Sequence, residues 1–449
     1  MEKFKKYTSV EINSKKCNKN SIFIVLNDKY SNNTHYINDA ITHGATLIIS
    51  NYKINCSVKN VVYKNIYYIF YKLLNFFYPN NIKLIGVTGT DGKTSTCLMI
   101  QSLISQNSNC GYIGTNGIIF NNNVREINNT TPDIVTIRKS LFEMYVTGVK
   151  YVAMECSSEG ILSNRLFSLE FDSIVYTNIT HEHLNTHKTM DNYVETKLSL
   201  IKRIKNNGLI IVNGDDYYLT KIRGKNVITY GLYNADCVAH NIKQSINETK
   251  FDYKYKTNNV VTIPFFGKYN IYNFLASILV LEQFNLNYNL DFNLMNKING
   301  RFELIKSANK EVVIDFAHTP NALENLLKNI RQVTRKNIIL VMGSSGGKDA
   351  SKRPLLGYIA DKYASDIIIT SEDPKNELIT NIFYDLTTKI KKEYYLVLFR
   401  KDAIKMGLEL CDENSILVIV GKGVENTEQI YNIKFPHNDY LYTKSLLNA

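Results

Sequence analysis

Residues 84–95 read LIGVTGTDGKTS, and this stretch decides how the rest of the chain is interpreted. The apolar run 84–87 is typical of a buried strand, and the segment 94–104 has the pattern of a helix. Between them lies a turn that contains Gly89 and Gly92. Such a turn presents successive backbone N–H groups and a helix N-terminus to phosphate. The stretch therefore predicts a phosphate-binding loop in an α/β fold.

Lys93 and Thr94 occupy the two positions of this loop whose side chains contact the phosphates and the metal ion. In a phosphate loop the lysine reaches the terminal phosphates of a nucleotide and the hydroxyl binds Mg²⁺. The usual motif has its first glycine six residues before the lysine, but that residue is Val87 here. The alternative is a glycine-rich turn with an exposed lysine. Strand, glycines, lysine and hydroxyls follow one another in the order of an ATP-binding loop, which is the interpretation we adopt.

Apolar runs separated by helix-length segments recur after this loop. The alternation predicts βαβ units and mainly parallel sheets. We expect strands of a first sheet at 84–87, 151–154, 173–176 and 209–212, and strands of a second sheet at 312–315, 338–342, 366–370 and 416–420. Between the two series, we expect antiparallel strands at 250–255 and 260–263 and a helix at 271–284.

A smaller α/β unit is expected before the loop. It would hold strands at 21–26 and 45–49 and a helix at 36–43. The changes of pattern divide the α/β chain into three predicted domains, 1–80, 81–298 and 299–449. No linker rich in Gly, Ser or Pro marks these boundaries.

The composition is that of a folded chain with more than one core. The chain has 449 residues, of which 44% are hydrophobic, and this length allows two or three domains. No apolar run approaches the roughly 18–20 residues that span a bilayer, and the N-terminus lacks the apolar stretch of a signal peptide. We therefore predict a cytoplasmic protein without a membrane partner. The seven cysteines are scattered, so neither disulfides nor a zinc site is indicated.

The charge balance is basic, with 53 Lys and Arg against 41 Asp and Glu and a net charge of +12. Nucleic acid is one explanation of a basic excess, and an anionic small substrate is another. No block of Lys and Arg stands out from the mixed charge. Nucleic acid is therefore not predicted as a partner.

Polar side chains follow two strands of the first series. Glu155 follows the run 151–154, and Thr177 and Asn178 follow the run 173–176. The carboxyl ends of parallel strands meet at one edge of a sheet, so these residues should face the phosphate loop. A carboxylate there can hold the Mg²⁺ of a nucleotide.

The segment 180–187 holds three of the eight histidines and raises the alternative of a zinc hydrolase. His183 and His187 have the i, i+4 spacing of a ligand pair on a helix. The segment is not His-Glu-x-x-His, however, and the spacing offers no third ligand.

These motifs, taken in order, resemble the Mur ligases, the ATP-dependent amide-forming enzymes of peptidoglycan precursor synthesis, and most closely the MurE branch. The resemblance covers nearly the whole chain: GTDGKTS at 89–95, NTTP at 129–132, ECSS at 155–158, TNITHEHLNTH at 177–187, YVETK at 193–197, GKYNIYN at 267–273, GRFE at 300–303, DFAHTP at 315–320, KRP at 352–354 and GKGVE at 421–425. It implies a monomer with a domain for the UDP-sugar, a central ATPase domain and a Rossmann-like C-terminal domain for the amino acid.

The resemblance also implies a role for each matched residue. Catalysis would fall to Lys93, Glu155, His183 and Lys197. ATP would bind Gly89, Thr90, Asp91, Gly92, Lys93, Thr94, Ser95, Asn273, Arg301, Asp315 and His318. Mg²⁺ would bind Thr94, Glu155, His183 and Lys197, the last as a carbamate, because a bare lysine would repel the ion. The UDP-N-acetylmuramoyl-L-Ala-D-Glu acceptor would bind Ser14, Thr130, Thr131, Ser157, Ser158 and Arg165, and the amino acid would bind Asp373, Lys375, Gly421 and Glu425.

Two departures from the family pattern affect substrate recognition. The uridine segment Asp-Ser-Arg appears as Asn13-Ser14-Lys15, and the Asp-Asn-Pro-Arg of diaminopimelate-adding enzymes appears as Glu372-Asp373-Pro374-Lys375. Lys375 could pair with a distal carboxylate, and Asp373 could attract the side-chain ammonium of lysine. A diamino acid is therefore expected, and meso-diaminopimelate and L-lysine both remain open, with a slight preference for lysine.

Three other interpretations keep the phosphate loop but change the function. A paralogue could ligate another amino acid or use a non-nucleotide acceptor in specialised metabolism. A P-loop protein could bind ATP as a switch, although it would not need His183, Lys197 or a second α/β unit. A catalytically dead homologue would show no ATP turnover that requires acceptor and amino acid together.

Overall fold

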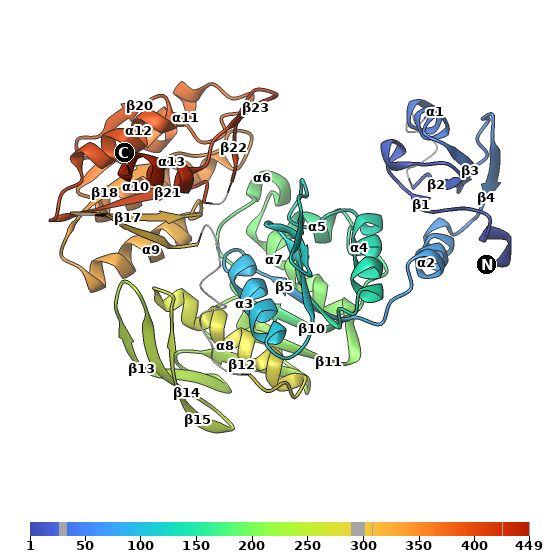
Figure 1. Ribbon diagram of the computed structural model, residues 1–449, viewed down its shortest axis with the longest axis horizontal. Helices are drawn as coiled ribbons and strands as arrows, with labels where there is room; N and C mark the ends of the chain where they lie inside the picture. Colours follow the sequence, from blue (N-terminus) through green and yellow to red (C-terminus); the bar gives the residue numbers. More distant parts are fainter. Residues whose placement is uncertain (27–33, 289–300, 308, 424, 449) are drawn as a thin grey trace.

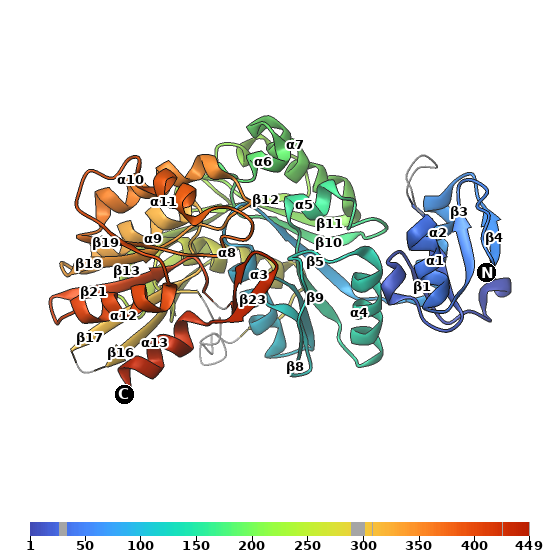
Figure 2. The same ribbon diagram turned by 90° about the horizontal axis from the view of Figure 1, so that it is seen from above.

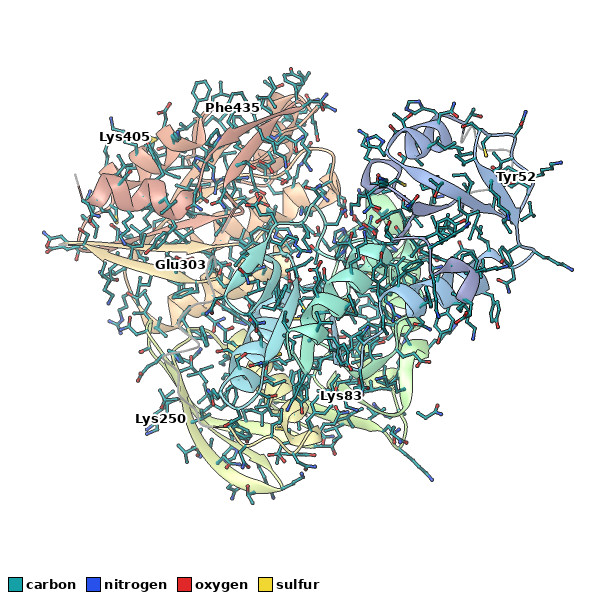
Figure 3. The ribbon with its side chains drawn as sticks, turned by 45° about the vertical axis from the view of Figure 1, so that its right-hand side comes forward. Tyr52, Lys83, Lys250, Glu303, Lys405 and Phe435 are labelled. Atoms are coloured by element: carbon teal, nitrogen blue, oxygen red, sulfur yellow. The ribbon has the colours of Figure 1, made fainter. Side chains whose placement is uncertain are left out.

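The computed structural model describes residues 1–26, 34–288, 301–307, 309–423 and 425–448. In it the chain forms three α/β units (Figure 1). Seen from above, the N-terminal unit lies at one end of the molecule beyond α4, and the C-terminal unit lies at the other (Figure 2). Tyr52 and Lys405 mark these two ends (Figure 3). The predicted boundary at 298 and 299, and Gly300 of the GRFE motif, lie outside the described residues.

The N-terminal unit is a small parallel sheet with the order β1-β2-β3-β4 among the described residues. Its elements are β1 (Val10–Glu11), β2 (Ser21–Ile24), α1 (Thr34–Thr42), β3 (Ala45–Ser50) and β4 (Lys59–Val62). The strands and helix expected there are confirmed. The helix α2 (Ile66–Phe77) follows and was not predicted. Its Tyr67 and Phe70 rings lie 5.2 and 5.9 Å from the ring of Phe167, which joins this unit to the central one.

The central unit is built on a long sheet whose described strands have the order β15-β14-β13-β12-β11-β10-β5-β9-β6-β7-β8. The parallel part contains β5 (Lys83–Thr88), β6 (Cys110–Gly114), β9 (Tyr151–Glu155), β10 (Phe171–Tyr176), β11 (Ile204–Asn213) and β12 (Val227–Gly231). At the edges lie β7 (Gly117–Phe120), β8 (Asn123–Arg125), β13 (Cys237–Gln244), β14 (Thr249–Tyr255) and β15 (Thr257–Ile263). The predicted antiparallel strands are β14 and β15, and they pair with each other.

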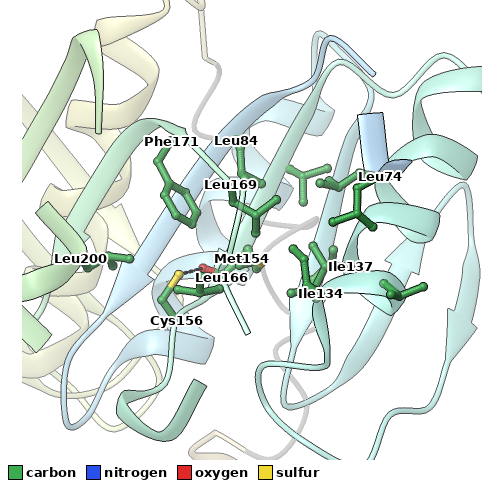
Figure 4. Packing of buried hydrophobic residues seen from close by; sticks show 14 of the residues in the cluster. Leu74, Leu84, Ile134, Ile137, Met154, Cys156, Leu166, Leu169, Phe171 and Leu200 are labelled. Atoms are coloured by element: carbon green, nitrogen blue, oxygen red, sulfur yellow. Dashed lines mark hydrogen bonds between the residues drawn. The ribbon is translucent and has the colours of Figure 1, made fainter. Parts of the chain in front are cut away.

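Helices cover both faces of this sheet because successive strand residues point to opposite sides. Ile85 of β5 packs in one buried cluster with α3 (Lys93–Ser105) and α8 (Lys268–Gln283). Leu84 packs in the other with α2 and α4 (Ile134–Val146). Figure 4 shows Leu74 of α2 and Ile134 of α4 in this second cluster. The shorter helices are α5 (Ser158–Leu162), α6 (Leu184–His187) and α7 (Met190–Leu198).

The C-terminal unit has its own sheet, as predicted, with the order β16-β17-β21-β18-β19-β20 among the described residues. The strands are β16 (Glu303–Ser307), β17 (Lys310–Asp315), β18 (Asn337–Met342), β19 (Asp366–Thr370), β20 (Tyr395–Val397) and β21 (Ser415–Val420). One face carries α9 (Pro320–Val333), α10 (Arg353–Tyr363) and α11 (Ile379–Thr387), and the other carries α12 (Arg400–Leu410) and α13 (Asp439–Leu447). A hairpin of β22 (Thr427–Ile430) and β23 (Ile433–Pro436) precedes α13, and Phe435 lies on it (Figure 3).

The seven cysteines are free thiols, and all but Cys56 are buried. In the part of the chain that the structure describes, no helix is long and apolar enough to cross a membrane.

Candidate active site

The phosphate loop joins β5 to α3, and its two glycines are required by its surroundings. A Cβ at Gly89 would lie 1.8 Å from Thr177 Oγ1, so no larger residue fits there. Gly92, which caps α3, has a φ of 82°, the left-handed region that favours glycine. Thr177 Oγ1 donates to Asp91 O at 2.6 Å, and Asn178 Oδ1 accepts from Asp91 N at 2.9 Å. The two residues after β10 therefore brace the loop, as their position at the sheet edge predicted.

Lys93 folds back over this loop. Its Nζ donates to Gly89 O at 2.9 Å and to Thr90 O at 2.7 Å. Burial lowers the pKa of its ammonium, and the carboxylates of Glu155 and Asp91 oppose that effect. A partly buried ammonium whose charge is only partly compensated favours an anionic ligand, which is the role expected of this lysine.

Glu155 ends β9 beside the loop and is fully buried. Its Oε1 accepts from Tyr112 Oη at 2.5 Å and from Thr115 N at 2.9 Å, and its Oε2 accepts from Thr115 Oγ1 at 3.2 Å. These contacts fix the carboxylate at the carboxyl edge of the sheet. Tyr112 and Thr115 were not predicted, since nothing in their local sequence marks them.

His183 and Lys197 both lie near the ring of Tyr193, and the pKa of each is strongly lowered. The pKa of the His183 imidazole falls to about 3 because of burial and the nearby ammonium groups of Lys93 and Lys197. Burial, followed by the charge of Lys93, holds the pKa of Lys197 well below its usual range. Lys197 Nζ donates to Gly89 O at 2.7 Å. The His183 imidazole is therefore neutral near pH 7, as a metal-ligating histidine has to be, and the shift of Lys197 favours the neutral amine that reacts with CO₂.

The predicted acceptor segment packs against the same edge. Thr131 Oγ1 donates to Glu155 O at 2.9 Å and lies 3.0 Å from Ser157 Oγ. Arg165 Nη1 donates to Thr131 O at 2.9 Å. Ser158 is buried, and its hydroxyl has no hydrogen-bond partner among the described residues. This group of small hydroxyl side chains and one arginine suits a polar, anionic acceptor.

The C-terminal unit reaches the loop through side chains that include Arg301, Thr319 and Asn321, the last of which donates to Asp91 Oδ2 at 2.9 Å. Arg301 Nη2 donates to Thr94 Oγ1 at 3.1 Å, and Thr319 Oγ1 donates to Asp91 Oδ1 at 3.0 Å. Asp315 accepts from Phe302 N at 2.7 Å and from Ala317 N at 2.8 Å. His318 is held by burial at a pKa well below its usual range. Thr319 caps α9 and is followed by Pro320, a helix-start signal that could have identified it.

The predicted amino-acid residues surround a buried ammonium. Lys422 Nζ donates to Asp373 Oδ1 at 2.8 Å and to Glu425 Oε2 at 2.7 Å, and its side chain is 0% exposed. Glu372 is buried against Gly421, where a Cβ would lie 2.0 Å from Glu372 Oε2. Lys422 was part of a matched motif but was not assigned a role, and it organises both carboxylates of this pocket.

One cavity of about 2450 Å³ connects these groups. Predicted site residues from both larger units line it: Thr90, Asp91, Gly92, Lys93, Thr94, Ser95, Thr130, Glu155, Ser157, Ser158, Arg165, His183, Asn273, Arg301, Asp315, His318, Asp373, Lys375, Gly421 and Glu425. Gly89, Thr131 and Lys197 do not line the cavity. Gly89 and Thr131 contact the lining residues Lys93 and Ser157, and Lys197 contacts Gly89. Ser14 is not brought to the cavity; it begins a 3-10 turn (Ser14–Lys16) in the N-terminal unit.

The donor groups beside the loop fit Mg²⁺ better than zinc. In the described residues, no three His, Cys, Asp or Glu side chains are grouped so that they could hold a metal by themselves. The zinc site considered for His183 and His187 is therefore not supported. Mg²⁺ is usually held by one or two carboxylates together with substrate phosphates. Thr94, Glu155 and His183 offer a hydroxyl, a carboxylate and a neutral imidazole for an ion that arrives with ATP.

Comparisons with known proteins agree with this geometry. The Mur ligase middle domain matches residues 87–281, and the Mur ligase glutamate ligase domain matches residues 300–423. UDP-N-acetylmuramoyl-L-alanyl-D-glutamate--2,6-diaminopimelate ligase 1 of Clostridium acetobutylicum is 33% identical over 96% of this chain and 92% of its own length.

Two solved structures have the same fold over nearly the whole chain. A UDP-N-acetylmuramoyl-L-alanyl-D-glutamate--2,6-diaminopimelate ligase superposes with a TM-score of 0.67 at 25% identity, covering 98% of this chain and 95% of the other. The MurF ligase of Thermotoga maritima in complex with ADP superposes with a TM-score of 0.69 at 18% identity, covering 94% and 95%.

Proposed function

This chain belongs to the Mur ligase family, and from that premise we propose that it is an ADP-forming amide ligase that adds a diamino acid to UDP-N-acetylmuramoyl-L-Ala-D-Glu. The observation that carries the proposal is the single cavity shared by the phosphate loop, the acceptor segment and the C-terminal pocket. Amide formation from a carboxylate needs ATP, the acceptor and the amino acid, which these three parts would bind, within reach of one another. Because ATP and UDP-linked precursors are cytoplasmic compounds, we place the reaction in the cytoplasm.

The reaction has two steps. An oxygen of the acceptor carboxylate attacks the γ-phosphorus of ATP, the bond from that phosphorus to the β,γ-bridging oxygen breaks, and ADP leaves. The amine of the diamino acid then attacks the carbon of the acyl phosphate, loses a proton and expels phosphate. Lys93 offsets charge on the transferred phosphoryl group, and Arg165 and Ser157 orient the acceptor beside it. When bound, Mg²⁺ supplies Lewis-acid stabilisation of the phosphoryl oxygens.

Lys197 supports this scheme through its lowered pKa. A neutral amine reacts with CO₂ to form a carbamate, whereas an ammonium does not. Burial and the neighbouring Lys93 lower the pKa of Lys197, which shifts this side chain toward the neutral amine that forms the carbamate. The product would add a carboxylate near His183, where the ion is expected.

The charges of the C-terminal pocket favour meso-diaminopimelate over L-lysine, against the slight preference drawn from sequence. Asp373 is already bound by Lys422, so it is not free for the side-chain ammonium of lysine. Lys348 and Lys375 both line the cavity, and neither forms an ion pair within the described part of the chain. The pKa of Lys375 is lowered by burial and by the charge of Lys348. A second carboxylate on the ligand would neutralise these two cations, and lysine has none.

Competing diamino acids provide the test. We expect purified protein with ATP, Mg²⁺ and the UDP-linked acceptor to form amide product with meso-diaminopimelate at a kcat/KM at least about tenfold above that for L-lysine, because one charge pair in a partly buried site is worth about 1.4 kcal/mol or more. Lys375→Ala should remove most of that preference, and Lys391→Ala, at an exposed site, should not. Equal rates for both amino acids would contradict the choice of diaminopimelate. No product with either would point to the paralogue with another substrate.

A further inference from the structure

A buried guanidinium lies behind the amino-acid pocket and is absent from the roles considered so far. Arg400 is the first residue of α12 and is 1% exposed. Its Nε donates to Asp439 Oδ1 at 2.8 Å, and its Nη2 donates to Asp439 Oδ2 at 2.7 Å. Asp439, the first residue of α13, is 0% exposed. The fork of this pair joins the N-termini of the two helices on one face of the C-terminal sheet.

Two further N–H groups of Arg400 donate to main-chain carbonyls. Nη2 donates to Val420 O at 2.7 Å, and Nη1 donates to Ser371 O at 3.4 Å. Val420 ends β21, and Ser371 directly follows β19. Gly421 follows Val420, and Glu372 follows Ser371. The two loops of the pocket begin at these residues. A single side chain therefore bonds the roots of both loops, across β18, which lies between the two strands.

The hairpin β22–β23 closes a ring of contacts around the same centre. Gln429 N donates to Asp373 Oδ1 at 2.8 Å, and Tyr431 N donates to Lys375 O at 2.7 Å, so the hairpin holds the loop 372–375. At its far end, His437 Nε2 lies 2.7 Å from Asp439 Oδ1. The pocket loops, the hairpin and α13 thus all connect back to the Arg400–Asp439 pair.

We propose that Arg400 is a positioning residue for the amino-acid pocket: its guanidinium fixes the separation of the loops 372–375 and 421–425. This inference rests on the proposed function, which assigns those loops to the amino acid. If Arg400 served stability alone, its ion pair with Asp439 would be enough, and hydrogen bonds to the carbonyls of Ser371 and Val420 would not be needed. The planar guanidinium can bond a carboxylate and the carbonyls together, whereas a lysine ammonium cannot match that geometry.

The test separates positioning from stability. Arg400→Met alone leaves Asp439 buried without a partner, so the main variant is Arg400→Met with Asp439→Leu, which removes both charges and fills the space with apolar atoms. We expect this variant to raise the KM for the diamino acid at least about tenfold, with the KM values for ATP and for the acceptor within about twofold of wild type. Arg400→Lys, which keeps the charge and its pairing with Asp439, should give an intermediate rise and serves if the double variant does not fold.

Arg331→Met is the matched control. Arg331 lies in the same unit and also donates to main-chain carbonyls, those of Tyr363 at 2.7 Å and Lys336 at 2.8 Å, but it does not line the cavity. It should leave every KM unchanged. An unchanged KM for the diamino acid in folded Arg400 variants, or an equal rise in all three KM values, would overturn the positioning role alone. A wild-type protein that forms no amide would overturn the proposed function and this inference with it.

Discussion

Lys352 Nζ donates to Glu182 Oε1 at 3.1 Å, and both side chains are only 5% exposed. Lys352 belongs to the C-terminal unit, and Glu182 precedes the candidate metal ligand His183 in the central unit. The pair therefore joins the two units beside the phosphate loop. The Thr319–Asp91 and Arg301–Thr94 contacts lie in the same interface. The structure thus has the C-terminal unit docked on the candidate nucleotide site, which is the arrangement that the proposed second step requires.

Removing Lys352 should loosen this docking. Breaking one side of a buried ion pair costs about 3–5 kcal/mol, less where the orphaned carboxyl takes up a proton. That cost falls on the docked arrangement, because the pair spans the two units. We expect Lys352→Met to increase the radius of gyration measured by small-angle scattering with an ATP analogue and acceptor.

The surface pair Lys362–Glu324 supplies the control for that experiment. Its partners are 47% and 42% exposed and 3.0 Å apart, so Lys362→Met should leave the scattering profile as in wild type. Adding Glu182→Leu to Lys352→Met should return the radius toward the wild-type value, since no buried charge is then unpaired. An unchanged profile in Lys352→Met would remove this pair from the docking of the units.

Lys197→Ala should abolish ligation by about two orders of magnitude or more, because the carbamate would be lost as a metal ligand. Bicarbonate should not restore the variant, since no amine remains to react. Wild-type activity should fall in buffer depleted of CO₂ and return when bicarbonate is added. Lys202→Ala, which alters an exposed lysine in the turn after α7, should behave as wild type. Normal turnover by Lys197→Ala would take this lysine out of the mechanism.

The stability of the C-terminal unit should depend on the protonation of Glu372. Burial raises the pKa of this carboxyl to about 7, although Arg400 and Lys422 oppose the rise. Between pH 4.5 and 7 the folded state therefore binds the proton more tightly than the unfolded state, and stability falls as the pH rises through that window. The full effect is at most about 3 kcal/mol.

Glu372→Gln should remove this dependence, because the amide does not titrate. The thermal unfolding midpoint of wild type, relative to that of the variant, should decrease between pH 4.5 and 7. Glu393→Gln, at an exposed position, should keep the wild-type profile. Parallel profiles for wild type and Glu372→Gln would show that this carboxyl does not take up the proton.

Local patterns in the sequence were enough to predict most of the fold that carries the site. The runs 84–87, 151–154 and 173–176 all became strands of the central sheet, because buried parallel strands read as continuous apolar segments. The helix α2 was missed, since its pattern of aromatic residues lies outside the motifs. The strands β7 and β8 were missed as well, because short edge strands bury few side chains and leave little periodicity.

The site was predictable where residues adjoin the phosphate loop or a strand end, as Lys93 and Glu155 do. Contacts between the units could not be predicted from the sequence. Glu182 and Lys352 are 170 positions apart, and Arg400 meets Asp439 only through the packing of α12 against α13. The role of Asp373 in amino-acid binding was not predictable either, because it depends on Lys422, whose ammonium donates to the Asp373 carboxylate.

Transfer of oxygen from the acceptor tests the central claim most directly. If the acceptor carboxylate is labelled with ¹⁸O, the acyl phosphate step requires one labelled oxygen to appear in the released phosphate. We predict labelled phosphate in equal amount to amide product, and only when ATP, Mg²⁺, acceptor and diamino acid are all present. Unlabelled phosphate, or phosphate released at the same rate without acceptor, would contradict activation of the carboxylate by this protein.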